Sequence, residues 1–202
     1  MKSLKAVAFV LIAALAVSCA AKIPQKDIDA ANTALADAQT AKADVYAATE
    51  YQAAMDAKTA LDTEIAAQEA LESGKSFKQT STLAKALLDA ANTAKAAAAT
   101  GMETVKGEVA TLLTDAQTVL ATVKAESADA SANAKKAKKA GLDVNAIVEQ
   151  VATNEQAITD ASAANDAGDY ATAQANLTAA KDVLAQLQSS LEAAGFTAQT
   201  AN

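Results

Sequence analysis

Residues 170–191 read YATAQANLTAAKDVLAQLQSSL, and this stretch decides the fold. Its apolar side chains recur at alternating steps of three and four residues, which places them on one face of an α-helix. Alternating steps of this kind form the seam along which helices pack in coiled-coil-like bundles. The sequence therefore predicts a helix over 170–194 that packs against other helices. The seam positions are Tyr170, Ala173, Leu177, Ala180, Leu184, Leu187 and Leu191.

The same spacing predicts five more helices, at 27–45, 48–73, 77–99, 102–140 and 144–167. Residues suited to helix ends lie between them, because glycine favours the left-handed conformation after a helix and Asp or Ser accepts the free N–H groups at its start. The expected end and start residues are Asp27, Gly74 with Ser76 and Gln79, Thr100 with Gly101, Gly141 with Asp143, and Gly168 with Asp169.

Alanine dominates the composition, with 59 of the 202 residues and only one proline in the chain. Alanine is the strongest helix former because it loses no side-chain entropy in a helix. It also buries little apolar area, so we expect close helix contacts and a thin core. Runs of β-branched and aromatic residues, which are typical of strands, are missing. The sequence therefore predicts an all-α fold, an elongated antiparallel bundle or rod.

An internal repeat indicates that this bundle is a duplicated three-helix unit. Residues 35–45, LADAQTAKADV, match residues 113–123, LTDAQTVLATV, at seven of eleven positions, five of which are not alanine. A weaker offset of 93 residues superposes the later helices, for example Phe77 on Tyr170. We expect a first unit at 27–99, a second unit at 100–194 and a flexible tail at 195–202.

The amino-terminal 19 residues, MKSLKAVAFVLIAALAVSC, have the layout of a secretory signal peptide. Lys2 and Lys5 precede an apolar run at 6–17, which is too short to span a bilayer as a stable helix. Small residues and the only cysteine, Cys19, follow that run. We expect a signal helix at 1–18 and a short tether at 19–26.

Residues 15–19, LAVSC, resemble the bacterial lipobox, although Ala16 stands where leucine is usual. The resemblance implies cleavage between Ser18 and Cys19 and attachment of acyl chains to the cysteine. Two or three acyl chains anchor a protein stably, whereas one does not. The alternative is an ordinary signal peptide that is cleaved near Ala20 or Ala21. By resemblance to sorting rules, Ala20 in place of aspartate favours the outer membrane of a diderm bacterium.

Residues 30–91, from AANTALADAQ to AKALLDAA, resemble a family of alanine-rich helical domains of unknown function in bacterial envelope lipoproteins. The resemblance covers 27–99 and, more loosely, 105–194. The family has a proline-containing break between its first two helices, where this chain has Tyr46-Ala47-Ala48-Thr49-Glu50-Tyr51. Without the proline, the first two helices could continue as one bent rod. The family implies a role in the cell envelope and carries over no catalytic residues.

The composition disfavours enzymes and nucleic-acid binding. The chain has no histidine, no arginine and a formal net charge of −7, so it lacks the commonest general base and the usual phosphate-binding cations. Short Ser-Lys pairs at 73–78 are typical of turns, and the acidic residues Asp62, Glu69 and Glu72 are typical of a solvated helix face. We expect no catalytic residue, no metal site and no cofactor.

One local cluster stands out in this acidic chain, Lys135-Lys136-Ala137-Lys138-Lys139. Four lysines in five residues could contact anionic lipid headgroups or a cell-wall polymer. The alternative is that Lys135, Lys136, Lys138 and Lys139 stabilise the carboxyl end of a helix through its macrodipole.

The sequence as a whole favours a lipid-anchored structural or interaction protein of the cell envelope, a spacer or an adaptor. The alternatives are a carrier of lipid or another small ligand between the two units, and a surface-exposed antigen or adhesin. The expected partners are the membrane, through Cys19, and a protein or cell-wall component that the sequence does not identify. Exposed helix seams could also allow self-association.

Overall fold

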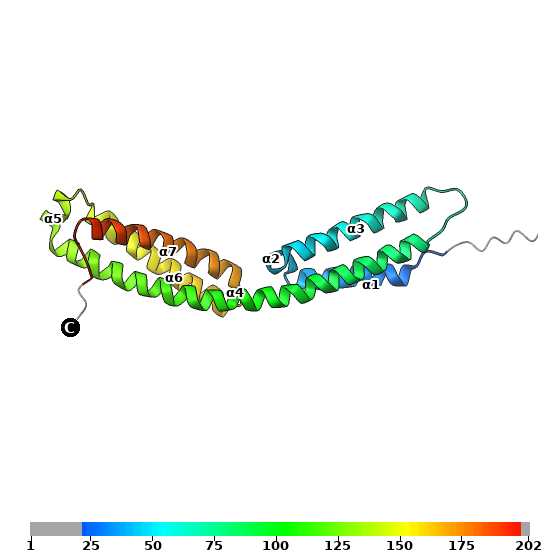
Figure 1. Cartoon of the computed structure of the whole chain (residues 1–202), viewed down its shortest axis with the longest axis horizontal. Helices are drawn as coiled ribbons and strands as arrows, with labels where there is room; N and C mark the ends of the chain where they lie inside the picture. The colour runs from blue at the N-terminus through cyan, green and yellow to red at the C-terminus, as the bar shows by residue number, and fades with distance from the viewer. Residues whose placement is uncertain (1–21, 199–202) are drawn as a thin grey trace, which may run out of the picture. The chain divides into compact units, whose positions relative to one another are not determined.

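The computed structural model describes residues 22–198, and throughout this range the chain consists of α-helices joined by turns (Figure 1). The predicted all-α fold is confirmed. The signal helix expected at 1–18 lies outside the described residues. The helices are α1 (Gln25–Thr40), α2 (Ala43–Tyr46), α3 (Ala48–Glu69), α4 (Lys78–Ala132), α5 (Ala134–Lys139), α6 (Val144–Asp166) and α7 (Tyr170–Ala193).

The chain divides into two compact units between Ala98 and Ala99, a boundary that lies within α4. The first unit contains α1, α2, α3 and the part of α4 up to residue 98. The second contains the rest of α4 with α5, α6 and α7. Each unit is therefore built on three long helical segments, one of which is a part of α4.

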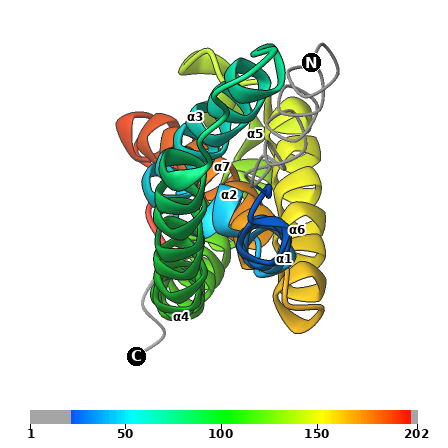
Figure 2. The same ribbon diagram turned by 90° about the vertical axis from the view of Figure 1, so that its right-hand side faces the viewer.

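In the first unit α3 runs opposite to α1, and α4 runs alongside α1 in the same direction (Figure 1). Asp27 and Asp37 of α1 contact Ser81 and Lys95 of α4, in the same order along both helices. Figure 2 shows α1 nearly end on. The buried positions are mostly alanines with a few larger side chains, so the predicted thin packing is confirmed. Fully buried members are Ala31, Ala38, Ala43, Ala54, Leu61, Ala84, Leu87, Ala91, Ala94 and Ala98.

The first two predicted helices do not continue as one rod, because the chain turns twice between residues 41 and 47. Lys42 adopts the left-handed conformation, with φ 55° and ψ 40°, and Ala47 leaves the helical region with φ −148° and ψ 50°. The short helix α2 lies between these two residues. The helix predicted at 27–45 is therefore wrong in its last turn, and Val45, expected on its apolar face, is 50% exposed.

The predicted helix stop at Thr100–Gly101 is wrong, because α4, which is 55 residues long, continues through it to Ala132. Glycine in a helix interior costs about 1 kcal/mol relative to alanine, and the alanines before it and the apolar seam after it outweigh that cost. Thr104 Oγ1 donates to the Thr100 carbonyl oxygen, as in an uninterrupted helix. The expected helix at 102–140 also ends early, at Ala132.

Two predicted helix starts also differ from the structure. The first helix begins at Gln25, directly after Pro24, so Gln25 and Lys26 belong to the helix and not to a tether. Asp27 therefore lies in the first turn and accepts a bond from Ser81 Oγ at 2.7 Å. Likewise α4 begins two residues after Ser76, whose N–H donates to Gln68 Oε1, so Ser76 is not its N-cap. The helix expected to reach residue 73 ends at Glu69.

The second unit has a larger apolar core, formed where α4, α6 and α7 meet. The seam predicted from residues 170–191 is confirmed, since its members from Ala173 to Leu191 are buried and Tyr170 is half-buried. Apolar positions on α4 and α6 face this seam. They include Val109, Ala116, Leu120 and Val123 on α4, and Ile147, Val151 and Ile158 on α6.

Across residues 22–198, no helix is both apolar enough and long enough to cross a membrane.

Candidate functional site

The lysine cluster lies on α5, a short helix at the end of the second unit (Figure 1). The helix is separated from α4 by Asn133, whose backbone leaves the helical region with φ −110° and ψ 42°. The side chain of Asn133 bonds to the last turn of α4. Its Nδ2 donates to the Asp129 carbonyl oxygen at 3.0 Å and to Asp129 Oδ1 at 2.8 Å. The break gives α5 a direction that the straight continuation of α4 would not have.

Glycine ends α5 in the way that the sequence predicts. Gly141 has φ 79°, a conformation that side chains disfavour. Its N–H donates to the Lys138 carbonyl oxygen, and the N–H of Leu142 donates to that of Ala137. This pair of bonds is a Schellman motif, which satisfies carbonyl groups that the helix end leaves free.

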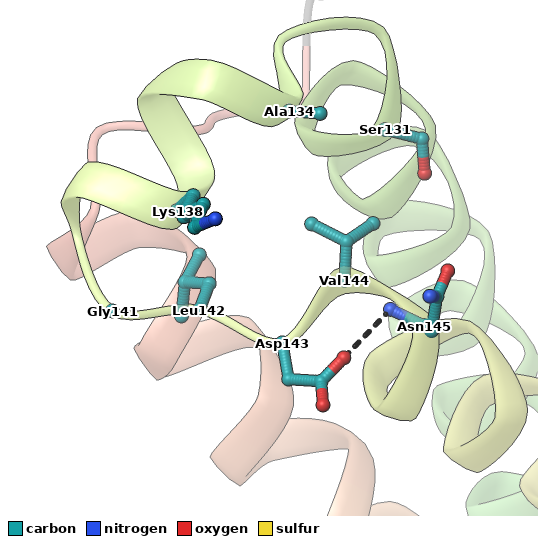
Figure 3. A pocket seen from close by; sticks show the side chains of 8 residues that line it. All are labelled: Ser131, Ala134, Lys138, Gly141, Leu142, Asp143, Val144 and Asn145. Carbon is teal, nitrogen blue, oxygen red and sulfur yellow. Dashed lines mark hydrogen bonds between the residues drawn. The ribbon is translucent and has the colours of Figure 1, made fainter.

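The next helix, α6, begins at Val144, with Asp143 as its N-cap. The Asp143 carboxylate accepts the N–H groups of Asn145 and Ala146 at 3.1 and 3.2 Å, as predicted for this residue. Figure 3 shows the first of these bonds. The equivalent prediction for Asp169 is confirmed only in position, because α7 starts after it without a bond from its side chain.

The four lysines of α5 do not act as one group. Lys135, Lys138 and Lys139 are exposed, share one face of the helix at i, i+3 and i+4 spacing, and have no bonded partner among the described residues. Lys136 instead reaches the segment after α7. Its Nζ donates to the Gly195 carbonyl oxygen at 2.6 Å and lies 4.2 Å from the centre of the Phe196 ring.

An open hollow of about 660 Å³ lies beside α5 (Figure 3). The ammonium group of Lys138 points into it, and Val144 lies across from that group. The hollow combines the ammonium group of Lys138 and the carboxylate of Asp143 with hydroxyl, amide and apolar groups, so its two formal charges cancel. Its lining residues are Ser131, Ala134, Lys138, Gly141, Leu142, Asp143, Val144 and Asn145.

The segment after α7 is the clearest correction to the sequence analysis. Residues 195–198 were predicted as part of a flexible tail, yet Phe196 is fully buried in the core of the second unit. A Schellman-type turn like the one at Gly141 directs it inward, because the N–H of Phe196 donates to the Leu191 carbonyl oxygen at 3.0 Å. The sequence signal was available, since an apolar residue directly after a helix-ending glycine commonly packs back on the last turn.

Glu126 is a second residue that the sequence analysis missed. Its side chain is buried on α4 at 1% exposure, and its Oε1 accepts the N–H of Ala198 at 3.3 Å. Burial raises the pKa of this carboxyl above its ordinary value, the bond from Ala198 lowers it, and the negative charge of Glu192 raises it further. Extending the α4 seam three residues past Val123 places Glu126 at the helix interface, which is the signal that could have found it.

The remaining predicted site residues are not brought together. Ser18 and Cys19 lie outside the described residues. Asp62 pairs with Lys58 on its own helix, and Glu69 and Glu72 are exposed. Among residues 22–198, no group of three or more acidic or cysteine side chains is placed to hold a metal ion.

The fold and this site define the described chain as an all-α protein of two three-helix units with a basic helix at one end of the second unit. No protein-family model, curated protein or solved structure matches the chain.

Proposed function

We propose that the chain is a lipid-anchored structural or interaction protein of a bacterial cell envelope. The observation that carries this proposal is the sequence before Cys19, in which a basic start, an apolar run and small residues lead to the only cysteine. With acyl chains on Cys19, the two helical units would be held beside a membrane, where their faces are available to a protein or cell-wall partner. Ala20 favours the outer membrane.

The test is metabolic labelling of the whole chain in a diderm host with a tagged fatty acid. We expect label on the wild-type protein and none on Cys19→Ser, and we expect only the wild type to float with membranes on a density gradient. Ser73→Ala is the control, since it changes an exposed turn residue outside the lipobox and leaves the acceptor sulfur in place. A wild-type product that carries no label would contradict the proposal.

The unpaired lysine face of α5 favours a second element of this function, contact with an anionic lipid surface. Lys135, Lys138 and Lys139 share one face of α5, and the half-buried apolar side chains of Leu142 and Val144 line the hollow beside Lys138. Cations next to apolar groups are typical of protein surfaces that bind lipid headgroups. Lys136 takes no direct part, because Gly195 and Phe196 occupy it.

This contact is tested on unacylated chain starting at residue 20, so that binding reports on the protein surface alone. We expect it to sediment with vesicles that contain anionic phospholipid, less so at high salt, and not after Lys→Gln substitution at 135, 138 and 139. The matched control substitutes Lys26, Lys78 and Lys85, which are exposed and also unpaired. If both triple variants lose vesicle binding equally, the binding depends on net charge and not on the α5 face. If the chain binds isolated cell wall but not vesicles, the lysine face contacts a cell-wall polymer and not lipid.

The carrier and adhesin alternatives make different predictions. A carrier retains a ligand through gentle purification, which native mass spectrometry detects as added mass. An adhesin is removed from intact cells by an added protease. Crosslinking in intact cells identifies the partner of a spacer or adaptor directly.

A further inference from the structure

Residues 195–198, the C-terminal strap, are attached to the second unit at two points. The first attachment is Phe196, the largest fully buried side chain among the described residues, with Lys136 over its ring. Lys136 also binds the Gly195 carbonyl oxygen at 2.6 Å, so this attachment joins the strap to α5. It combines burial of an aromatic ring, a cation–π contact and a charge-assisted hydrogen bond.

The second attachment is the bond from the Ala198 N–H to Oε1 of Glu126, at 3.3 Å. The other carboxyl oxygen of Glu126, Oε2, is buried and has no hydrogen-bond partner among residues 22–198. A charged carboxylate with one bare oxygen in a buried position is costly, because water no longer solvates it. The bond from Ala198 favours the charged form of Glu126, but it offsets only part of the cost of burial, since the pKa of the carboxyl is raised overall in the closed structure.

The charged groups around this end do not compensate for a negative charge on Glu126. Glu192 of α7 repels it, and its effect adds to that of burial in raising the pKa of the Glu126 carboxyl. Lys124, two residues earlier on α4, is paired with Glu155 of α6 at 2.9 Å. Lys136 of α5 is bound to the Gly195 carbonyl oxygen, at the first attachment.

We propose that the charge on Glu126 controls the second attachment of the C-terminal strap. When Glu126 is protonated, the strap is closed and Ala198 lies against the carboxyl. When the proton leaves to solvent, the carboxylate regains its hydration only if the strap lifts, so the open form gains population. The first attachment does not involve Glu126, so it holds in both states. The strap therefore responds to pH at one end and not at the other.

A single fluorophore on the strap tests the proposal in the complete mature chain. The sequence contains no tryptophan, so Thr197→Trp, at an exposed strap position, introduces the only indole and leaves Phe196 in place. Its fluorescence anisotropy and acrylamide quenching are measured from about pH 4 to pH 8, the range above the ordinary pKa of glutamate. We expect anisotropy to fall and quenching to rise as pH increases, while far-UV circular dichroism stays constant.

Variants separate the role of Glu126 from a general effect of pH. In the Thr197→Trp background, Glu126→Gln should abolish the pH dependence and keep the indole immobile throughout, because the neutral amide still accepts the Ala198 N–H. Glu192→Gln should shift the midpoint of the deprotonation to lower pH, because it removes a negative charge that raises the pKa of Glu126. The matched control is Glu149→Gln, which removes an exposed carboxylate of α6, leaves the pair of Lys124 with Glu155 intact and should leave the curve unchanged.

A second measurement does not depend on the fluorophore. Hydrogen exchange of the Ala198 amide is followed by NMR, and exchange becomes faster with pH in any exposed amide. In the wild type we expect the rate to rise by more than this intrinsic increase. In Glu126→Gln we expect the intrinsic increase alone. An indole that is equally mobile at all pH values would overturn the proposal, as would a pH dependence that survives Glu126→Gln.

Discussion

Asp115 of α4 holds Lys181 of α7 at 2.7 Å, and the same contact occurs in the first unit, where Asp37 of α1 holds Lys95 of α4 at 2.8 Å. The two aspartates occupy equivalent positions of the internal repeat, 78 residues apart. In both units the aspartate lies on the first of the three helical segments and the lysine on the third. The repeat is therefore visible in a tertiary contact as well as in the sequence.

We expect this ion pair to contribute little to stability, since both side chains are more than a third exposed. A double-mutant cycle with Asp115→Asn and Lys181→Met should give a coupling energy of about 0.2–1 kcal/mol. Urea unfolding measures it, and the coupling should shrink in 1 M salt because exposed charges are screened. The pair formed by Asp37 and Lys95 serves as an internal comparison, and a coupling above about 2 kcal/mol in either unit would contradict the expectation.

Leu177→Ala should destabilise the second unit by about 2–5 kcal/mol, because the leucine is fully buried and its removal leaves a cavity. Urea-induced loss of helicity provides the measurement. Val148→Ala on α6 is the control, since Val148 is 46% exposed and its truncation should cost well under 1 kcal/mol. Similar losses in the two variants would mean that the core is not where the structure puts it.

Two glycine substitutions should have opposite signs. Gly107 lies within α4, and an added Cβ would meet no atom within 4 Å, so Gly107→Ala should stabilise by about 0.5–1 kcal/mol. Gly168 ends α6 with φ 77°, where an added Cβ is strained, so Gly168→Ala should destabilise by about 1–2 kcal/mol. Thermal unfolding of both variants beside the wild type checks the pair. Stabilisation by Gly168→Ala would be incompatible with the left-handed turn.

The stability of the second unit should decrease as pH rises through the titration of Glu126. Because burial raises the pKa of this acid in the folded state, the folded state binds more protons than the unfolded state in that range. The loss should begin above about pH 4.3, the ordinary value for glutamate, and should be complete once pH exceeds the raised pKa. Calorimetry of the wild type against Glu126→Gln isolates this contribution. Equal slopes of stability against pH in the two proteins would exclude it.

Much of the fold could be predicted from the sequence, because the apolar spacing along each helix reports directly on which face is buried. The seam from Ala173 to Leu191 is an example. The helix ends at Gly141 and Gly168 were also predictable, since their left-handed turns require a residue without a side chain. The continuation of α4 through Gly101 was not, because it depends on packing before and after the glycine, which outweighs local preference.

The candidate site was predicted less well, because tertiary contacts decide it. Sequence alone groups Lys136 with its neighbours, whereas the structure directs it to a segment 59 residues later. The register of the third segments is a similar case. The expected offset of 93 aligns their apolar seams, but the matching lysines, Lys95 and Lys181, lie 86 residues apart. A shift of one heptad keeps the same face toward the core, so spacing cannot distinguish the two registers.

The length of α4 has a consequence for how the chain denatures. Residues 78–98 of this helix complete one hydrophobic core, and residues 99–132 begin the other. If either core dissolves, one part of a continuous helix loses its neighbours, and most of the stability of a helix in a protein comes from such tertiary packing. Fraying then moves along the shared backbone toward the intact half. The two repeats are thus thermodynamically linked, and damage in one lowers the resistance of the other to heat, denaturant and proteolysis.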